Sequence, residues 1–335
     1  MTNKLIETRN ITKIFKIGSL ISGTRLVAVD DVSLSLESGK PSILSIVGES
    51  GSGKTTLARI MLRLLEPDRG EAFIEGKSLF RANDRISDHQ FKRLVQPIFQ
   101  NPFETFSAHK TVDTYLYETA LNLEIAHDRQ EARAVVADVL TSVGLDREAV
   151  AGKYPNQFSG GELQRISVAR ALIPKPKLII ADEPVSMIDA SMRMNIVNLF
   201  LGLKESHNVS FLYITHDLST AYYVSDFIAI MYRGNVVEYG PSNLILTAPA
   251  HPYTELLMES VPQVGQKWGE EIVLPDIEVK EYQAAACKFA PRCSYAREIC
   301  RRSRPPMVHL PQARQTLCFK PVDYAEGAAL SRTPS

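Results

Sequence analysis

The chain has 335 residues, of which 44% are hydrophobic and 23% charged, and its 38 Lys and Arg residues balance its 38 Asp and Glu residues. This length suits two domains, or one large domain with an extension at one end. The balanced charge excludes a global attraction to nucleic acid or to anionic lipid.

The first residues, MTNKLIETRNITKIF, alternate polar and apolar side chains. They lack the apolar centre and the cleavage site of a secretory signal. No later stretch approaches the roughly 18 uninterrupted apolar residues that a membrane-spanning helix needs. We therefore expect the chain to stay in the cytoplasm.

The first part of the chain predicts a small antiparallel sheet beside a second, buried one. Residues 4–36 and 70–80 show the alternation of half-buried strands, with turn signals between them. Residues 41–48 (PSILSIVG) instead form an apolar, β-branched run that is typical of a strand buried on both faces. A helical pattern over residues 53–66 follows directly.

The middle of the chain contains a helical block and further buried strands. Residues 104–150 are rich in apolar residues at helical spacing. Apolar runs recur at residues 176–184 and 209–217, and a helical pattern over residues 192–206 separates them. Short buried strands that alternate with helices indicate an α/β fold, with a mostly parallel sheet and helices on its faces.

After about residue 240 the chain becomes loop-rich and dotted with proline. We place a domain boundary there. The prediction is a first domain over residues 1–240, with a helical subdomain at about 100–165, and a C-terminal extension over residues 241–335.

The stretch GESGSGKTT matches G-x-x-x-x-G-K-[ST], a phosphate-binding loop. Its glycines let backbone N–H groups close around an anion, and the helix that follows adds its N-terminal dipole. Lys54 is expected to reach the outer phosphates of a nucleotide and Thr55 to ligate Mg²⁺. The predicted nucleotide-binding residues of this loop are Gly48, Glu49, Ser50, Gly51, Ser52, Gly53, Lys54, Thr55 and Thr56.

A second buried strand ends in two acidic residues, Asp182 and Glu183, within LIIADEP. Such carboxylates complete a phosphate site of this kind. We expect Asp182 to hold the Mg²⁺ ion and Glu183 to act as the general base that polarises the attacking water.

Between these motifs lies FSGGELQRISVARAL, residues 158–172. Ser159, Gly160 and Gly161 precede a helix there, and their N–H groups form an anion-binding N-terminus. The stretch resembles the signature helix of the ATP-binding cassette (ABC) family of transporter ATPases. The resemblance implies a P-loop NTPase core of ABC type, in which these three residues bind the γ-phosphate of ATP held by a partner subunit in a head-to-tail dimer.

The resemblance also implies roles for four other positions. Gln100 resembles the Q-loop glutamine, which senses Mg²⁺ and the attacking water and links the helical block to the membrane subunits. Residues 186–189 (SMID) resemble the D-loop at the dimer interface. His216 resembles the switch histidine that contacts the γ-phosphate and orients Glu183, and Phe15 matches the aromatic residue that stacks on adenine.

Glu162 departs from the family pattern, in which glutamine is the commonest residue at this position. A carboxylate in the first turn is favourable for the helix dipole, but it would repel ATP nearby. Ser159 and both glycines are intact, so we expect a working ATPase that binds ATP and Mg²⁺.

The segment PAHPYTELLMESVPQ, residues 249–263, resembles the oligopeptide, dipeptide and nickel importer branch of this family. The resemblance implies two permease subunits, a second ATPase that is a copy or a paralogue, an external solute-binding protein, and a place on the cytoplasmic face of the membrane. ATP binding would close the ATPase dimer and hydrolysis would reopen it. Peptides are the expected solute, with nickel and oligosaccharides as alternatives, and residues 101–116 are the candidate permease contact.

All four cysteines lie near the end of the chain, with the spacing C-x5-C-x6-C-x17-C. A reducing compartment favours metal ligands over disulfides, but the spacing matches no generic metal pattern and leaves zinc, an iron–sulfur cluster and unpaired thiols open. The run CKFAPRCSYAREIC resembles the cysteine motif of peptide-importer ATPases, which implies a [4Fe–4S] cluster held by Cys287, Cys293, Cys300 and Cys318. Five arginines nearby would compensate the thiolates or form a solvated basic face: Arg292, Arg297, Arg301, Arg302 and Arg304.

Two competing functions remain open at this point. A cassette ATPase acting on DNA would carry a long coiled-coil insertion, and one acting on ribosomes would carry two cassettes; the chain has one cassette and no sustained heptads. A binding module without catalysis is favoured only by Glu162.

Overall fold

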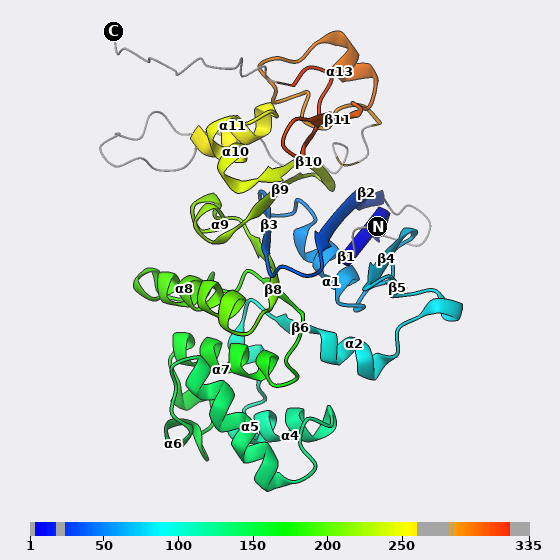
Figure 1. Cartoon of the computed structure of the whole chain (residues 1–335). Coiled ribbons are helices and arrows are strands. Elements are labelled where there is room, and N and C mark those ends of the chain that lie inside the picture. The colour runs from blue at the N-terminus through cyan, green and yellow to red at the C-terminus, as the bar shows by residue number, and fades with distance from the viewer. Residues whose placement is uncertain (1–3, 18–23, 260–281, 283–284, 322–335) are drawn as a thin grey trace.

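The computed structural model describes residues 4–17, 24–259, 282 and 285–321. These residues form a central sheet, a smaller sheet beside it, a helical block at one end and a C-terminal extension at the other (Figure 1).

The central sheet has the strand order β11-β12-β10-β9-β3-β8-β7-β6. The strands from β9 to β6 are parallel, and the other three pair antiparallel. The interior strands β3, β7 and β8 are almost wholly buried, as expected for apolar runs covered on both faces. The strands are β3 (Ile43–Val47), β6 (Val95–Ile98), β7 (Leu178–Asp182), β8 (Ser210–Thr215), β9 (Phe227–Tyr232), β10 (Asn235–Pro241), β11 (Met307–Leu310) and β12 (Arg314–Leu317).

The smaller sheet is antiparallel, with the order β2-β1-β4-β5. One apolar cluster joins it to the central sheet, and helix α1 contributes Leu57 and Ile60 to that cluster. The helix that follows the phosphate loop is thereby fixed between both sheets. The elements are β1 (Lys4–Ile17), β2 (Thr24–Glu37), β4 (Arg69–Ile74), β5 (Lys77–Ser78) and α1 (Lys54–Met61).

The helical block lies between β6 and β7 in the sequence and packs against α8 through a second apolar cluster. Figure 1 shows it as the green end of the molecule, beyond the edge strand β6. Its helices are α3 (Pro102–Thr105), α4 (Val112–Asn122), α5 (Arg129–Ser142), α6 (Arg147–Val150) and α7 (Gly160–Leu172). Besides α1, the α-helices described outside the block are α2 (Asp88–Leu94), α8 (Ala190–Ser206), α9 (Leu218–Val224), α10 (Ser242–Thr247), α11 (Pro252–Glu259) and α13 (Glu298–Arg302).

The extension is joined to the central sheet. Strand β12 pairs with β10, and β11 pairs with β12, so the sheet continues into a region where the sequence predicts only loops. A third apolar cluster places Tyr253 and Phe289 of the extension against Tyr232 of β9. The predicted α/β fold, with its antiparallel sheet and helical block, is confirmed.

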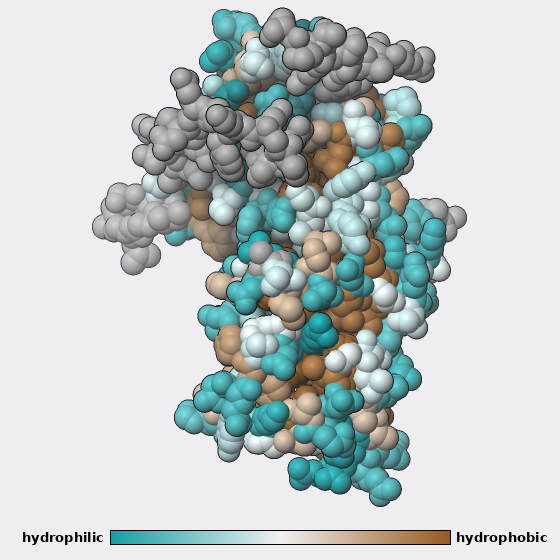
Figure 2. Space-filling view, turned by 90° about the vertical axis from the view of Figure 1, so that its left-hand side faces the viewer, coloured by the Kyte–Doolittle hydropathy of each residue, from teal (hydrophilic) through white to brown (hydrophobic). Residues whose placement is uncertain are grey.

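Hydrophilic side chains dominate the surface of the helical block on the face that Figure 2 shows, and apolar side chains gather nearer the middle of the molecule. Among the described residues, no helix combines the length and the apolar character that crossing a bilayer requires.

Candidate functional site

The phosphate loop connects β3 to α1 and surrounds the amino group of Lys54. This side chain is 5% exposed, and its Nζ donates to the carbonyl oxygens of Gly48 at 2.8 Å and Glu49 at 3.0 Å. Burial lowers the pKa of Lys54, and the carboxylates of Glu183, Asp182 and Glu49 oppose that effect. The loop is therefore a compact cradle with one cation at its centre.

At two positions of the loop only glycine fits. Gly53 adopts φ +105°, and a Cβ there would lie 2.1 Å from the Ala28 carbonyl oxygen. A Cβ on Gly48 would lie 2.1 Å from the Met231 carbonyl oxygen. Any side chain at either position would push the loop away from β2 or β9.

Asp182 ends strand β7 beside the start of α1. Its Oδ1 accepts a hydrogen bond from the Thr55 hydroxyl at 3.2 Å. Burial raises the pKa of Asp182 above the ordinary carboxyl range. A hydroxyl and a carboxylate thus meet at the entrance of the loop, and such hard oxygen atoms are the ligands that Mg²⁺ prefers.

Glu183 follows directly and receives two side chains from other strands. Gln100 Nε2 donates to its Oε2 at 3.3 Å, and His216 Nδ1 lies 3.3 Å from its Oε1. Glu183 has φ +48°, and its N–H donates to the Ile214 carbonyl of β8 at 2.9 Å. A residue held in this sparsely populated conformation is fixed by its surroundings. The parallel strands β6, β7 and β8 end at one edge and bring these three side chains together.

Other predicted site residues lie outside this set of contacts. Ser159 is the N-cap of α7, and its polar contacts are with Glu162 in the same turn. Gly160 faces the Met187 carbonyl, within the stretch that resembles a D-loop. The Phe15 ring is 37% exposed, near the end of β1, with the Lys13 ammonium 6.0 Å from its centre.

The predicted [4Fe–4S] site is wrong. Cys287, Cys293, Cys300 and Cys318 line one small cavity as free thiols, but no group of three or more His, Cys, Asp or Glu side chains in the described part of the chain is arranged to hold a metal ion. Burial raises the pKa of Cys287, Cys293 and Cys318, whereas a metal needs thiolates. Cys318 Sγ donates to the Lys320 carbonyl at 3.1 Å, as a protonated thiol does. The same geometry excludes a zinc site in the described part of the chain, and the four cysteines are unpaired thiols.

The extension instead supplies contacts to the phosphate loop that the sequence analysis missed. Arg292 forms a two-armed ion pair with Glu49, and the hydroxyls of Tyr253 and Tyr282 bond the loop backbone. Arg304 pairs with Asp30, so both arginines have carboxylate partners in the first part of the chain. No spacing in the sequence signals these contacts, because they depend on how the extension packs against the sheet.

Two family models match the chain. The first, described as ABC transporter, covers residues 29–186. The second, described as the C-terminal region of oligopeptide/dipeptide transporters, covers residues 237–300. The cassette core and the extension thus match separate models.

Two curated relatives resemble the chain over most of its length. A probable peptide ABC transporter ATP-binding protein of Sinorhizobium fredii is 34% identical, over 95% of this chain and 90% of the relative. The oligopeptide transport ATP-binding protein AppF of Bacillus subtilis is 37% identical, over 90% of this chain and 92% of its own length.

Among solved structures, a dimeric post-hydrolysis state of the ATP-binding cassette MJ0796 bound to ADP and Pi superposes with a TM-score of 0.60. It is 26% identical and covers 71% of this chain and 98% of the cassette. Its coverage shows that the resemblance in three dimensions concerns the cassette core.

Proposed function

The chain belongs to the ATP-binding subunits of ABC transporters, in the oligopeptide and dipeptide branch, and from that membership we propose how its residues drive a peptide importer. Cassettes of this family bind and hydrolyse ATP, and in importers they work as dimers attached to permease subunits. The solute proposed for this chain is an oligopeptide or dipeptide, because relatives that match at least 90% of it are named for the transport of peptides, oligopeptides or dipeptides.

The proposed ATP site is the loop from Gly48 to Thr56. Lys54 would exchange its bonds to the Gly48 and Glu49 carbonyls for bonds to the outer phosphates. Thr55 and Asp182 would hold Mg²⁺, which neutralises part of the phosphate charge when it is bound. The 3.2 Å contact between their oxygen atoms supports this pair as a ligand set.

Glu183 is the proposed general base. The observation that carries this role is its position between Gln100 and His216, 3.3 Å from each, at the edge where three parallel strands end. Gln100 and His216 would keep the Glu183 carboxylate aimed at the attacking water, and Gln100 would also sense Mg²⁺. A base that is already oriented loses little freedom when the water arrives.

The turn of Ser159, Gly160 and Gly161 is proposed to act in trans. Its polar contacts within the chain stay in the first turn of α7, and N–H groups at the N-terminus of a helix suit the γ-phosphate on a second ATPase subunit. Residues 186–189, which lie against Gly160, would meet the same partner, and Phe15 would stack on the adenine. That partner is a copy of this chain or a paralogue.

The permease subunits would dock in a groove of about 500 Å³ between α2, β6 and the helical block. Phe91, Pro97 and Phe99 line it on one side and Asn122, Leu123 and Arg170 on the other. The groove ends one residue before Gln100, so a permease helix seated there would move with the Q-loop. Residues 101–116, the stretch singled out in the sequence, do not line it.

Residues 1–240 form the nucleotide-binding domain, with the helical subdomain at about 100–165, and residues 241–335 form the extension. The subunit works at the cytoplasmic face of the membrane through the permeases, and an external solute-binding protein delivers the peptide.

The test uses the chain assembled with its permeases and its partner ATPase in lipid vesicles. We expect peptide-stimulated hydrolysis of Mg²⁺–ATP, and a loss of about 100-fold or more in E183Q, which keeps ATP bound. E148Q, on the exposed helix α6, is the matched control and should hydrolyse normally. If the wild type and E183Q both bound ATP but neither hydrolysed it, the proposal that this chain drives import by ATP hydrolysis would be refuted. If nickel or an oligosaccharide stimulated hydrolysis and peptides did not, the proposal that the solute is a peptide would be refuted.

A further inference from the structure

The extension contacts the phosphate loop most directly through Arg292. Its Nη1 lies 3.0 Å from Glu49 Oε2 and its Nη2 lies 3.0 Å from Glu49 Oε1. Such a two-armed pair between a guanidinium and a carboxylate fixes both the distance and the orientation of the two groups. The pair joins two residues 243 positions apart in the sequence.

Two aromatic rings also contact the Arg292 side chain. It is 13% exposed, and its guanidinium lies 5.8 Å from the centre of the Tyr232 ring and 6.0 Å from that of Phe289. Tyr232 belongs to β9, the strand beside β3, and Phe289 packs on it edge to face. Arginine stacked on aromatic faces loses little further freedom on pairing with a carboxylate.

Glu49 places a carboxylate within the phosphate loop. Its own backbone carbonyl accepts a hydrogen bond from Lys54 at 3.0 Å, and its carboxylate is one of those that oppose the effect of burial on the pKa of the same ammonium. Without a partner, this carboxylate would repel a nucleotide and attract the Lys54 ammonium. Arg292 cancels that charge from the side of the extension.

Two tyrosines hold the backbone of the same loop. The Tyr253 hydroxyl accepts a hydrogen bond from the Glu49 N–H at 3.1 Å, and the Tyr282 hydroxyl donates one to the Gly51 carbonyl at 3.1 Å. Both tyrosines lie beyond residue 241. The extension therefore holds the loop at its backbone and at its one acidic side chain.

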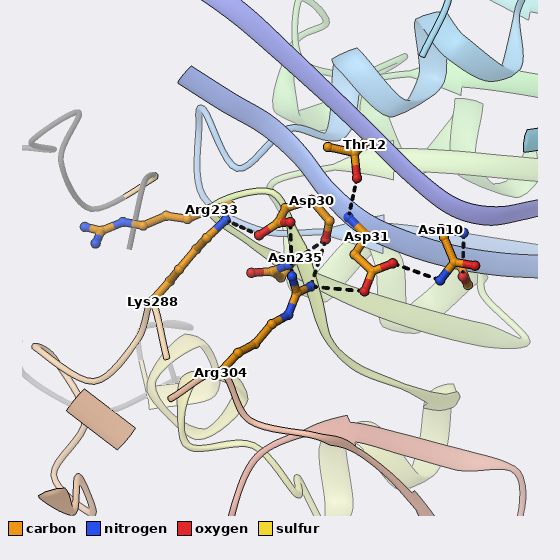
Figure 3. Close-up of polar contacts among 9 residues, drawn as sticks. Asn10, Thr12, Asp30, Asp31, Arg233, Asn235, Lys288 and Arg304 are labelled. Atoms are coloured by element: carbon orange, nitrogen blue, oxygen red, sulfur yellow. Dashed lines mark hydrogen bonds and ion pairs between the residues drawn. The ribbon is translucent and has the colours of Figure 1, made fainter. Parts of the chain in front are cut away.

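A second set of ion pairs anchors the extension away from the loop. Lys288 and Arg304 converge on Asp30, at 2.8 Å and 3.1 Å, and Lys288 also donates to the Arg233 carbonyl (Figure 3). These contacts fasten the extension to β2 and to the turn between β9 and β10. In the part of the chain that the structure describes, neither Lys288 nor Arg304 bonds the phosphate loop; the turn beneath them reaches the loop through the Gly234 N–H, which donates to the Ser52 carbonyl at 2.8 Å.

We propose that Arg292 is a positioning residue for nucleotide binding: it holds the Glu49 carboxylate away from the phosphates and fixes the loop that receives them. This inference rests on the proposed ATP site. It makes the extension part of the nucleotide-binding apparatus, so that a displacement of the segment from residue 287 to 293 would weaken nucleotide binding.

The test measures, by calorimetry on the full chain with Mg²⁺, the affinity for a non-hydrolysable ATP analogue. We expect R292A to weaken binding about tenfold, since an unscreened charge is left beside the phosphates. R304A, which breaks the ion pairs to Asp30 and Asp31, should change affinity less than twofold. In an E49A background R292A should also change affinity less than twofold, because the charge that Arg292 neutralises is gone.

A role in folding alone would give a different pattern, with equal losses from R292A in both backgrounds. That result, or an R292A affinity within twofold of the wild type, would overturn the proposal. If R292A does not fold, R292K replaces it, with an expected loss of about threefold that is absent in E49A. A wild-type chain that binds no analogue at all would refute the proposed ATP site itself. In the assembled complex, R292A should raise KM for ATP and leave kcat within twofold.

Discussion

Ser159 and Glu162 bond each other across the first turn of α7. The N–H and the hydroxyl of Ser159 donate to Glu162 Oε2 at 2.8 and 2.7 Å, and the Glu162 N–H donates to Ser159 Oγ at 3.3 Å. These hydrogen bonds, the one from the Ser159 backbone first, lower the pKa of Glu162. The carboxylate is therefore ionised at neutral pH, at the turn that is proposed to meet the partner's ATP.

The substitution Glu162→Gln should tighten ATP-dependent dimerisation. Glutamine keeps the reciprocal cap of the helix and removes the charge that repels the partner's γ-phosphate. In an E183Q background with ATP, sedimentation should show a dimer dissociation constant lower by about threefold, a modest effect because the site is exposed to solvent. E162A removes the cap as well, so it should lower the free energy of unfolding by about 1 kcal/mol. A weaker dimer in E162Q would contradict the prediction, because it would show that the Glu162 charge does not repel the partner's γ-phosphate.

Asp182→Asn should stabilise the nucleotide-free chain while it abolishes Mg²⁺-dependent hydrolysis. Burial raises the pKa of Asp182, so the folded chain binds this proton more tightly than the unfolded chain does, and stability falls as the pH rises from the ordinary carboxyl pKa through the folded one. Asparagine has no charge to desolvate. The gain in thermal midpoint, a few degrees Celsius, should be present at pH 7.5 and shrink at pH 4.5.

The exposed Asp84→Asn is the matched control for that experiment, and we expect no change in midpoint at either pH. An Asp182→Asn chain that gains equally at both pH values would show that desolvation of the carboxylate is not the cause.

The buried His251 should make the extension acid-sensitive. It is 2% exposed, its Nδ1 accepts a hydrogen bond from the Tyr253 N–H at 3.0 Å, and burial lowers its pKa to about 3. Below pH 6.5 the unfolded chain takes up a proton that the folded chain excludes, so stability falls as the pH drops toward 3. Between pH 7 and pH 5 this residue should cost about 2 kcal/mol of unfolding free energy.

Urea unfolding of His251→Asn measures this contribution. Asparagine retains an acceptor for the Tyr253 N–H but does not titrate, so its stability should depend less on pH. The exposed His207→Asn should retain the wild-type dependence. Identical slopes for His251→Asn and the wild type would contradict the prediction.

The parts of the site that the sequence predicts are those that local order determines. The phosphate loop is one continuous stretch, and Asp182, Glu183 and His216 follow apolar runs that end at one edge of a parallel sheet. The end of a buried strand is enough to predict Asp182 and Glu183 beside the loop, and the family resemblance adds His216 and Gln100. Their proximity in the structure follows from the parallel strand order.

The parts that the sequence does not predict depend on how distant segments pack. The spacing of the cysteines carries no information on whether their Sγ atoms converge on one ion, and the resemblance led to a cluster that the described geometry does not support. Strands β11 and β12 have four residues each, and they form because β12 pairs with β10 and β11 pairs with β12. The role of Arg292 depends on the same docking, because Glu49 lies in the first domain.

Arg314→Ala should detach the extension from the sheet. Glu238 of β10 is buried, and it accepts hydrogen bonds from the Ala250 and His251 N–H groups, the Thr254 hydroxyl and Arg314 Nη2 at 3.1 Å. Burial raises the pKa of Glu238, and the hydrogen bonds oppose this. Removal of Arg314 leaves a buried carboxylate without its cation, which should lower the free energy of unfolding by about 3 kcal/mol.

Limited proteolysis should show where that loss falls, with earlier cleavage beyond residue 241 in Arg314→Ala than in the wild type. The double variant Glu238→Gln with Arg314→Met removes both charges and keeps an amide oxygen for the His251 N–H and the Thr254 hydroxyl, which share Oε2 in the wild type, so it should recover part of the loss. Because protonation of Glu238 removes the unpaired charge, the deficit of Arg314→Ala should also diminish as the pH falls. A deficit that is the same at every pH, and that the double variant does not reduce, would assign the effect to lost packing of the Arg314 side chain rather than to the ion pair.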